Sequence, residues 1–293
     1  MLTTPLFELS AALPRLHGGR FGVTQIPPIP AVLIVGAGLL YGWGVRRANR
    51  LHPRHLWSAW RSAAFFGGLG LTAVSVGSFI GVYDQTLFWD HMTQHLMLVM
   101  VAAPLFALAA PLSLMWNATT GAAHQGVSRG LRSPIARFFD LPILAFSLYA
   151  LVIPITHLTS LYNDTLQNEV MRNFEHILFL VVGYLFWRQV FPVEHSSHRL
   201  HPALRMGYLF LAVPVDTFVG LSLSNLTHEI FPNYVLMHRP WGPSLVNDLH
   251  LGGVIMWVGG DTLMTLAMIP VAIAWLHLDE RNAHRIDLEL GLS

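Results

Sequence analysis

The 293-residue chain contains no cysteine, which excludes disulfides, thiolate metal sites and thiol catalysis. It also contains no lysine, so all 17 of its basic residues are arginine. Charged residues make up only 11% of the chain, whereas a soluble domain carries about 25%. This scarcity of charge, together with 53% hydrophobic residues, predicts a polytopic membrane protein. The net charge of +1 does not point to nucleic acid as a partner.

The apolar residues gather into seven segments, each close to the roughly 20 residues that span a hydrocarbon core. The predicted fold class is therefore all-α, with seven transmembrane helices at about 28–45, 61–83, 90–116, 138–158, 170–191, 204–224 and 248–276. The stretch before them lacks a basic region followed by a continuous apolar run, so we do not expect a cleaved signal peptide. The expected organisation is an external segment 1–27, a transmembrane domain 28–276 and a cytoplasmic tail 277–293.

The arginines predict the orientation of the bundle, because short loops rich in arginine stay on the cytoplasmic side. The N-terminal segment and the loops after segments two, four and six hold four arginines: Arg15, Arg20, Arg172 and Arg239. The other loops and the C-terminal tail hold thirteen: Arg46, Arg47, Arg50, Arg54, Arg61, Arg129, Arg132, Arg137, Arg188, Arg199, Arg205, Arg281 and Arg285. We therefore expect the N-terminus outside and the C-terminus inside.

Histidines lie at the segment ends that this orientation places outside. The run that begins at Phe88 carries His91 and His95 in its first two turns, and residues four apart lie on one stripe of a helix. Glu175 and His176 lie a turn or more inside their apolar run, where ionisable groups are costly and usually functional. We expect these histidines and acids to share the outer leaflet: His91, His95, His157, His176, His250, Asp84, Asp90, Glu175 and Asp248.

Each of these groups also has an ordinary structural interpretation. An interfacial histidine is often an amphipathic anchor or a hydrogen-bonded helix cap, and Asp84 and Asp90 can solvate a loop or cap the helix that follows them. Asp216 and Asp261 fall nearer the bilayer middle, where they form either a structural network or a proton relay. Met92 could join imidazoles around copper, although methionine is also an ordinary apolar filler.

The sequence lacks the common catalytic motifs. The HMTQH run of His91 and His95 is not the zinc-protease motif HExxH, because the glutamate that would act as general base is missing. The chain also has no phosphate-binding glycine loop, dinucleotide fingerprint or GxSxG elbow. These absences favour a role other than those enzyme classes.

Three runs carry a resemblance to a known family: DHMTQHLMLVMVAAPLFALAAPLSL, FEHILFLVVGYLFW and DLHLGGVIMWVGGD. They resemble the CtaG family of polytopic cytochrome c oxidase assembly factors, found in bacterial plasma membranes. The resemblance implies a multi-pass protein that helps a haem-copper oxidase to mature, with oxidase subunits and membrane lipid as partners. Where the family favours a glutamine-rich start, this chain has Asp248, Leu249 and His250. His250 is therefore either an added ligand or a tolerated polar substitution.

Composition and spacing leave three classes of function open. We favour a non-enzymatic assembly factor that binds or hands over copper at the outer face. The alternatives are a membrane-embedded zinc-dependent hydrolase and a b-type cytochrome with haem between histidines such as His95 and His176. The predicted metal ligands are His91, His95 and His176, and the side chains that could complete or orient the coordination are Met92, Asp90, Glu175, Asp248, His250 and His157.

Overall fold

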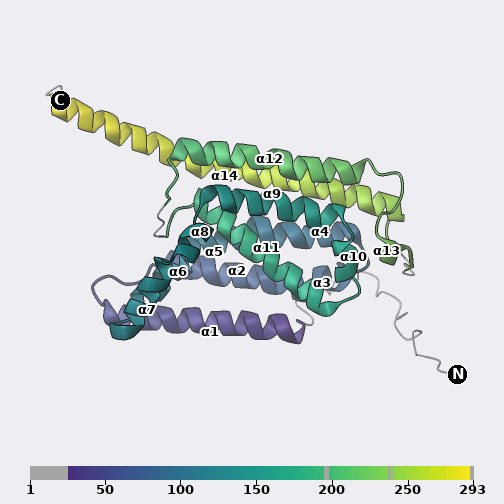
Figure 1. Cartoon of the computed structure of the whole chain (residues 1–293), viewed down its shortest axis with the longest axis horizontal. Helices are drawn as coiled ribbons and strands as arrows, with labels where there is room; N and C mark the ends of the chain where they lie inside the picture. Colours follow the sequence, from purple (N-terminus) through teal and green to yellow (C-terminus); the bar gives the residue numbers. More distant parts are fainter. Residues whose placement is uncertain (1–25, 195–197, 237–238, 240, 291–293) are drawn as a thin grey trace.

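The computed structural model describes residues 26–194, 198–236, 239 and 241–290, which form a bundle of roughly parallel long helices (Figure 1). This described part of the chain is helical throughout its regular structure and contains no strand, which confirms the all-α prediction. The elements are α1 (Pro28–Leu51), α2 (Ala59–Gly77), α3 (Phe79–Tyr83), α4 (Phe88–Leu96), the π-helix η1 (Met97–Ala102), α5 (Ala103–Ala109), α6 (Pro111–Asn117), α7 (Gly121–Leu131), α8 (Pro134–Phe139), α9 (Pro142–Leu158), α10 (Leu161–Thr165), α11 (Glu169–Val190), α12 (Pro202–Ser224), α13 (Pro232–Leu236) and α14 (Leu245–Leu290).

Within the described residues, five helical stretches are long and apolar enough to cross a membrane. They are Pro28–Leu51, Ala59–Tyr83, Phe88–Asn117, Pro202–Ser224 and Leu245–Ala283. The other two predicted segments are also helical, as α9 and α11. Helix α9 is apolar but has only 17 residues, and α11 carries charged side chains in its first two turns and near its end, which lower its mean hydropathy. The length and composition of the helices therefore support five spans.

Several predicted boundaries were wrong. The predicted segment 138–158 is broken at Asp140 and Leu141, between α8 and α9. The last helix does not end near 276 but continues to Leu290, so most of the predicted tail extends the helix beyond the bundle (Figure 1). The connections contain the short helices α7, α10 and α13, which lack the long apolar run used to recognise spans. The predicted external segment lies outside the described residues except for its last two.

The helix that carries His91 and His95 changes from α-helical to π-helical hydrogen bonding at η1. Pro104, which follows η1, leaves one backbone carbonyl of this segment without its usual partner. In η1 the N–H of Ala103 donates to the carbonyl of Leu98, five residues back. The same pattern would pair the Val99 carbonyl with residue 104, but proline has no N–H. Instead, Trp187 of α11 donates its indole N–H to the Val99 oxygen at 2.8 Å. A neighbouring helix thus satisfies the buried carbonyl, as an apolar surrounding requires.

Helices α12 and α14 pack tightly because glycines meet at their interface. A Cβ atom on Gly220 would lie 2.6 Å from the carbonyl oxygen of Gly253, and one on Gly253 would lie 2.6 Å from the oxygen of Gly220. Small residues allow such close backbone approach between membrane helices. The two helices lie side by side and run in opposite directions, as the green and yellow ribbons in Figure 1 show.

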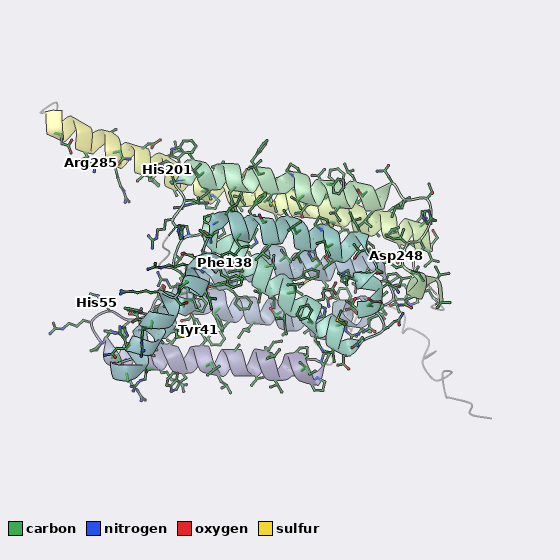
Figure 2. The ribbon with its side chains drawn as sticks, viewed as in Figure 1. Tyr41, His55, Phe138, His201, Asp248 and Arg285 are labelled. Carbon is green, nitrogen blue, oxygen red and sulfur yellow. The ribbon has the colours of Figure 1, made fainter. Side chains whose placement is uncertain are left out.

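Helix α1 lies at the edge of the bundle and is held mainly by its second half. The Tyr41 ring stacks on Phe65 of α2 with centroids 3.8 Å apart, and its hydroxyl donates to the Ala109 carbonyl at 3.0 Å. Gly44 allows contact with Leu114 of α6, whose Cδ2 lies 3.2 Å from the position of a Cβ there. These contacts fix the half of α1 that lies near His55, at the end of the bundle opposite Asp248 (Figure 2).

Candidate functional site

The start of α4 is held in place by Asp248 of α14, at one end of the bundle (Figure 2). The Asp248 carboxylate accepts hydrogen bonds from the backbone N–H groups of Phe88 and Trp89, each at 3.0 Å. It also forms an ion pair with Arg239, whose guanidinium donates to the Thr86 carbonyl at 3.1 Å. Helix N-termini carry unpaired N–H groups, and a carboxylate from elsewhere in the chain caps them here. The cap that we considered for Asp90 is therefore supplied by Asp248.

His91 and His95 face α9, where His157 occupies the last turn. The ring centroid of His157 lies 5.7 Å from that of His91 and 4.9 Å from that of His95. Aromatic rings enclose the group, with Tyr162 at 4.2 Å from His91 and Phe179 at 4.4 Å from His95. None of the three histidines is more than 3% exposed. The structure thus brings His157, ranked below His176 from the sequence, into ring contact with both histidines of α4.

The hydrogen bonds of this cluster leave several ring nitrogens free. His157 Nδ1 donates to the carbonyl of Ile153 at 2.8 Å, so in the neutral ring the lone pair is on Nε2. His157 Nε2, His91 Nε2 and both nitrogens of His95 have no hydrogen-bond partner among the described residues. Buried polar atoms are usually paired, so such a group of unsatisfied nitrogens calls for an explanation.

The ring spacings suit imidazoles that share one ion. A ligating imidazole nitrogen lies at about 2.0–2.1 Å from zinc, which puts the centroids of two rings on one ion roughly 5–6 Å apart. The 4.9 and 5.7 Å spacings agree with this range. As the side chains stand, however, no three described His, Asp or Glu side chains are arranged to hold a metal ion. Binding therefore requires the rings to turn, and the free nitrogens of His91 and His95 can turn without losing a hydrogen bond.

His176, the predicted third ligand, is engaged with a residue that the sequence did not single out. Gln94 donates its amide N–H to the Ser75 carbonyl at 2.9 Å and accepts with Oε1 from His176 Nε2 at 2.9 Å. The Nδ1 atom of His176 has no partner within the described part of the chain. Gln94 lies three residues after His91, so the sequence already indicated that the two side chains share one face of the helix. An amide is not a usual metal ligand, however, so this spacing did not mark Gln94 as a candidate.

Three carboxyl groups at this end of the bundle are almost fully buried: Asp84, Asp90 and Glu175. Asp90 is 0% exposed, and neither of its oxygens is hydrogen bonded to any residue that the structure describes. Asp84 Oδ1 and Glu175 Oε2 likewise find no partner there. Burial raises the pKa of Asp84 from 3.8 to about 7, although the Arg172 guanidinium opposes this shift. Asp90 and Glu175 therefore keep atoms that could orient a bound cation.

The tyrosines Tyr162 and Tyr234 close this end of the bundle. The Tyr234 hydroxyl donates to the backbone carbonyl of Asp84 at 2.9 Å and accepts a hydrogen bond from the Tyr162 hydroxyl at 2.5 Å, while the Tyr162 oxygen lies 3.3 Å from the same carbonyl oxygen. Burial raises the pKa of each tyrosine well above its usual value, so both stay protonated as donors. The pair joins α10 and α13 to the end of α3.

The other residues predicted to assist a metal already have structural partners. Met92 is fully buried on the side of α4 that packs against Gly252 of α14. His250 Nε2 donates to the Leu226 carbonyl at 2.6 Å, and both oxygens of Asp248 accept hydrogen bonds from α4. Among the predicted ligands, the side chains that keep an unpaired polar atom in the described structure are therefore His91, His95, His157, His176, Asp90 and Glu175.

Comparison with known proteins gives a family and several relatives. The model of the family described as cytochrome c oxidase caa3 assembly factor (Caa3_CtaG) matches residues 39–277. The chain is 27% identical over 285 residues to an uncharacterized protein of Mycobacterium tuberculosis, covering 91% of this chain and 43% of that protein. It is 28% identical over 265 residues to an uncharacterized protein of Mycobacterium leprae, covering 87% and 39%. The chain thus spans less than half the length of these curated relatives. No solved structure matches it.

Proposed function

Because the chain belongs to the Caa3_CtaG family of cytochrome c oxidase caa3 assembly factors, we propose that it helps an oxidase to mature by holding copper at its histidine end. We use "histidine end" for the end of the bundle that contains His91, His95, His157 and His176. The family consists of assembly factors, so the role of the chain is non-enzymatic. Copper is a cargo in this proposal, and its recipient is an oxidase subunit.

The observation that carries the proposal is the group of buried imidazoles with free nitrogens at suitable ring spacing. Imidazole suits copper as well as zinc, and the chain offers no thiolate to select another metal chemistry. In our proposal His91 and His95 supply two ligands from one helix. His176 or His157 supplies the third, while Asp90 and Glu175 orient the rings. A carboxylate that accepts a hydrogen bond from the second ring nitrogen of a ligating histidine commonly fixes the orientation of that ring.

We further propose that all seven long helical runs cross a bacterial plasma membrane, with the N-terminus and the histidine end outside. Support comes from the arginine distribution and from the packing of α9 against α12 and of α11 against η1 and α5, which places both helices inside the bundle. A reporter fused after Ser293 should be cytoplasmic, and one inserted beside Asn163 should be external. If both report the same side, this topology is wrong.

A deletion strain tests the proposed function in the cell. Loss of the gene should lower haem-copper oxidase activity while the oxidase subunits are still synthesised, and added copper should restore part of the activity. The wild-type gene and a His201→Ala variant should restore activity, because His201 lies at the opposite end of the bundle (Figure 2). A His95→Ala variant should not. Full oxidase activity in a deletion strain without a paralogue contradicts the assembly role.

A further inference from the structure

An apolar groove of about 300 Å³ lies between α1, α2 and α11, outside the histidine cluster. Its walls include Leu33 and Ala37 of α1, Leu69 of α2 and Val181 of α11. The groove lies along the first half of α1, whereas the contacts of Tyr41 and Gly44 are made by the second half. Leu33 and Val181 are each 49% exposed as well as lining the groove, so the groove opens toward the side of the bundle that faces lipid.

The groove has a polar end, formed by Asn173 and His176 of α11. Both side chains are more than nine-tenths buried, at 7% and 8% exposed. Asn173 Nδ2 and His176 Nδ1 find no hydrogen-bond partner among the residues that the structure describes. Leaving a buried polar atom unpaired destabilises a fold, so this end of the groove is suited to a polar group of a ligand.

The hydrogen bonds of Gln94 determine what His176 can offer that ligand. Because the Gln94 amide N–H donates to the Ser75 carbonyl, its Oε1 is the atom that faces His176. An oxygen acceptor requires the proton of the neutral ring to be on His176 Nε2, which leaves a lone pair on Nδ1. The polar end therefore presents one acceptor, His176 Nδ1, and one donor, the Asn173 amide. A hydroxyl group matches this pair, because it donates one hydrogen bond and accepts others.

We propose that the groove binds an isoprenoid quinol, whose ring hydroxyl donates to His176 Nδ1 and accepts from Asn173 Nδ2. None of the described residues lining the groove is charged, so a phosphate head group finds no counter-charge there. Phe65 and Phe106 line the same space and offer flat apolar surfaces to a ring. The isoprenoid chain then leaves between Leu33 and Val181 toward the lipid. This site is separate from the proposed copper ligands, except that His176 borders both.

The test compares head groups on the wild-type protein in lipid nanodiscs without added metal. The probes are a short-chain ubiquinol analogue, its quinone and its dimethyl ether, with binding measured by thermophoresis. The quinone and the ether cannot donate to His176 Nδ1, so the quinol should bind up to about tenfold more tightly than either. Equal binding of the three probes overturns the proposal. Equal displacement of the quinol by diacylglycerol also overturns it, since any hydroxyl lipid would then suffice.

Two matched variants of α1 locate the site. Ala37→Trp fills the groove and should weaken quinol binding by at least about tenfold, whereas Leu39→Trp places the same side chain at a position that is 70% exposed and should leave it unchanged. Asn173→Leu should weaken quinol and quinone binding alike, because both accept from the Asn173 amide. Wild-type affinity in a folded Ala37→Trp variant contradicts the proposal, and the head-group series on the wild-type chain decides the matter if that variant does not fold.

Discussion

The two ends of the bundle bury ionisable side chains in different ways. At the end opposite the histidines, the guanidinium of Arg188 lies 3.0 Å from Asp140 and 3.8 Å from Glu194. Glu194 also accepts from the backbone N–H of Leu112 and from the Tyr184 hydroxyl, each at 2.7 Å. We call this group of Asp140, Arg188 and Glu194 the arginine end. At the histidine end, by contrast, Asp90 and the rings of α4 keep unbonded polar atoms within the described structure.

The contrast indicates different roles for two sites that are similarly buried. A buried polar group costs stability unless it is hydrogen bonded, and a buried charge costs more unless it is paired. The arginine end meets this requirement and joins α6 and α11 to the connection that follows α11. The histidine end does not meet it, and such exceptions in folded proteins are concentrated at functional sites. The first end therefore serves stability, and the second is available for a ligand.

The largest expected effect is at the arginine end. Arg188→Ala removes the cation shared by two buried carboxylates, and breaking a buried pair in this way typically costs about 3–5 kcal/mol in the free energy of unfolding. At the histidine end, Asp90→Asn removes no hydrogen bond to a described residue, so it should change stability by less than about 1 kcal/mol or raise it. Unfolding in mixed micelles measures both. Similar losses from the two variants contradict the contrast.

A smaller effect should appear in the pH dependence of stability. The pKa of Asp84 rises from 3.8 to about 7 on folding, so the folded state binds more protons between these values and loses stability as pH rises. For one group the slope is at most about 1.4 kcal/mol per pH unit. Asp84→Asn should remove this part of the slope. The free energy of unfolding of the variant should therefore increase relative to that of the wild type from pH 5 to 7, and the difference should stay constant above pH 7. Glu280→Gln, at an exposed position of α14, should follow the wild-type curve. Parallel curves for Asp84→Asn and the wild type count against a buried, protonated Asp84.

The smallest expected effect concerns the cap of α4, and it is the difference between two variants of Asp248. Asp248→Ala and Asp248→Asn both remove the charge that pairs with Arg239, so both lose the ion pair. Only Asp248→Ala also removes every acceptor of the Phe88 and Trp89 N–H groups, and loss of an N-terminal cap costs about 0.5–2 kcal/mol. Asp248→Asn keeps one acceptor oxygen, so it should be more stable than Asp248→Ala by up to about this amount, and Asp279→Ala, on the exposed part of the same helix, should have no effect. Thermal unfolding of the three variants checks the order, and equal midpoints of Asp248→Ala and Asp248→Asn show that the cap does not support α4.

The sequence predicts the long helices well because apolar runs of membrane length are visible without tertiary information. It also predicts that His91 and His95 share a face, because four residues make about one helical turn. What it does not predict is how the helices rotate against each other. That rotation brings His157 into ring contact with both histidines and engages His176 with Gln94.

The sequence also does not predict contacts between distant segments, because these contacts depend on how the helices pack against each other. The cap of α4 comes from Asp248, 160 positions after Phe88, and only the packing of α14 against α4 brings the two together. Similarly, Pro104 predicts a disturbed helix, but the indole of Trp187 that satisfies the Val99 carbonyl lies on another helix. The short helices between the spans lack the long apolar run that marks a span, so only the structure reveals them.

The copper content of purified variants tests the central claim most directly. After loading with copper and removal of excess metal, the wild-type protein should retain one copper ion per chain by mass spectrometry of the metal. His95→Ala should lose it and His201→Ala should keep it, while His157→Ala and His176→Ala show which histidine supplies the third ligand. Full copper occupancy in a folded variant with His91, His95 and His176 all replaced by alanine contradicts the account.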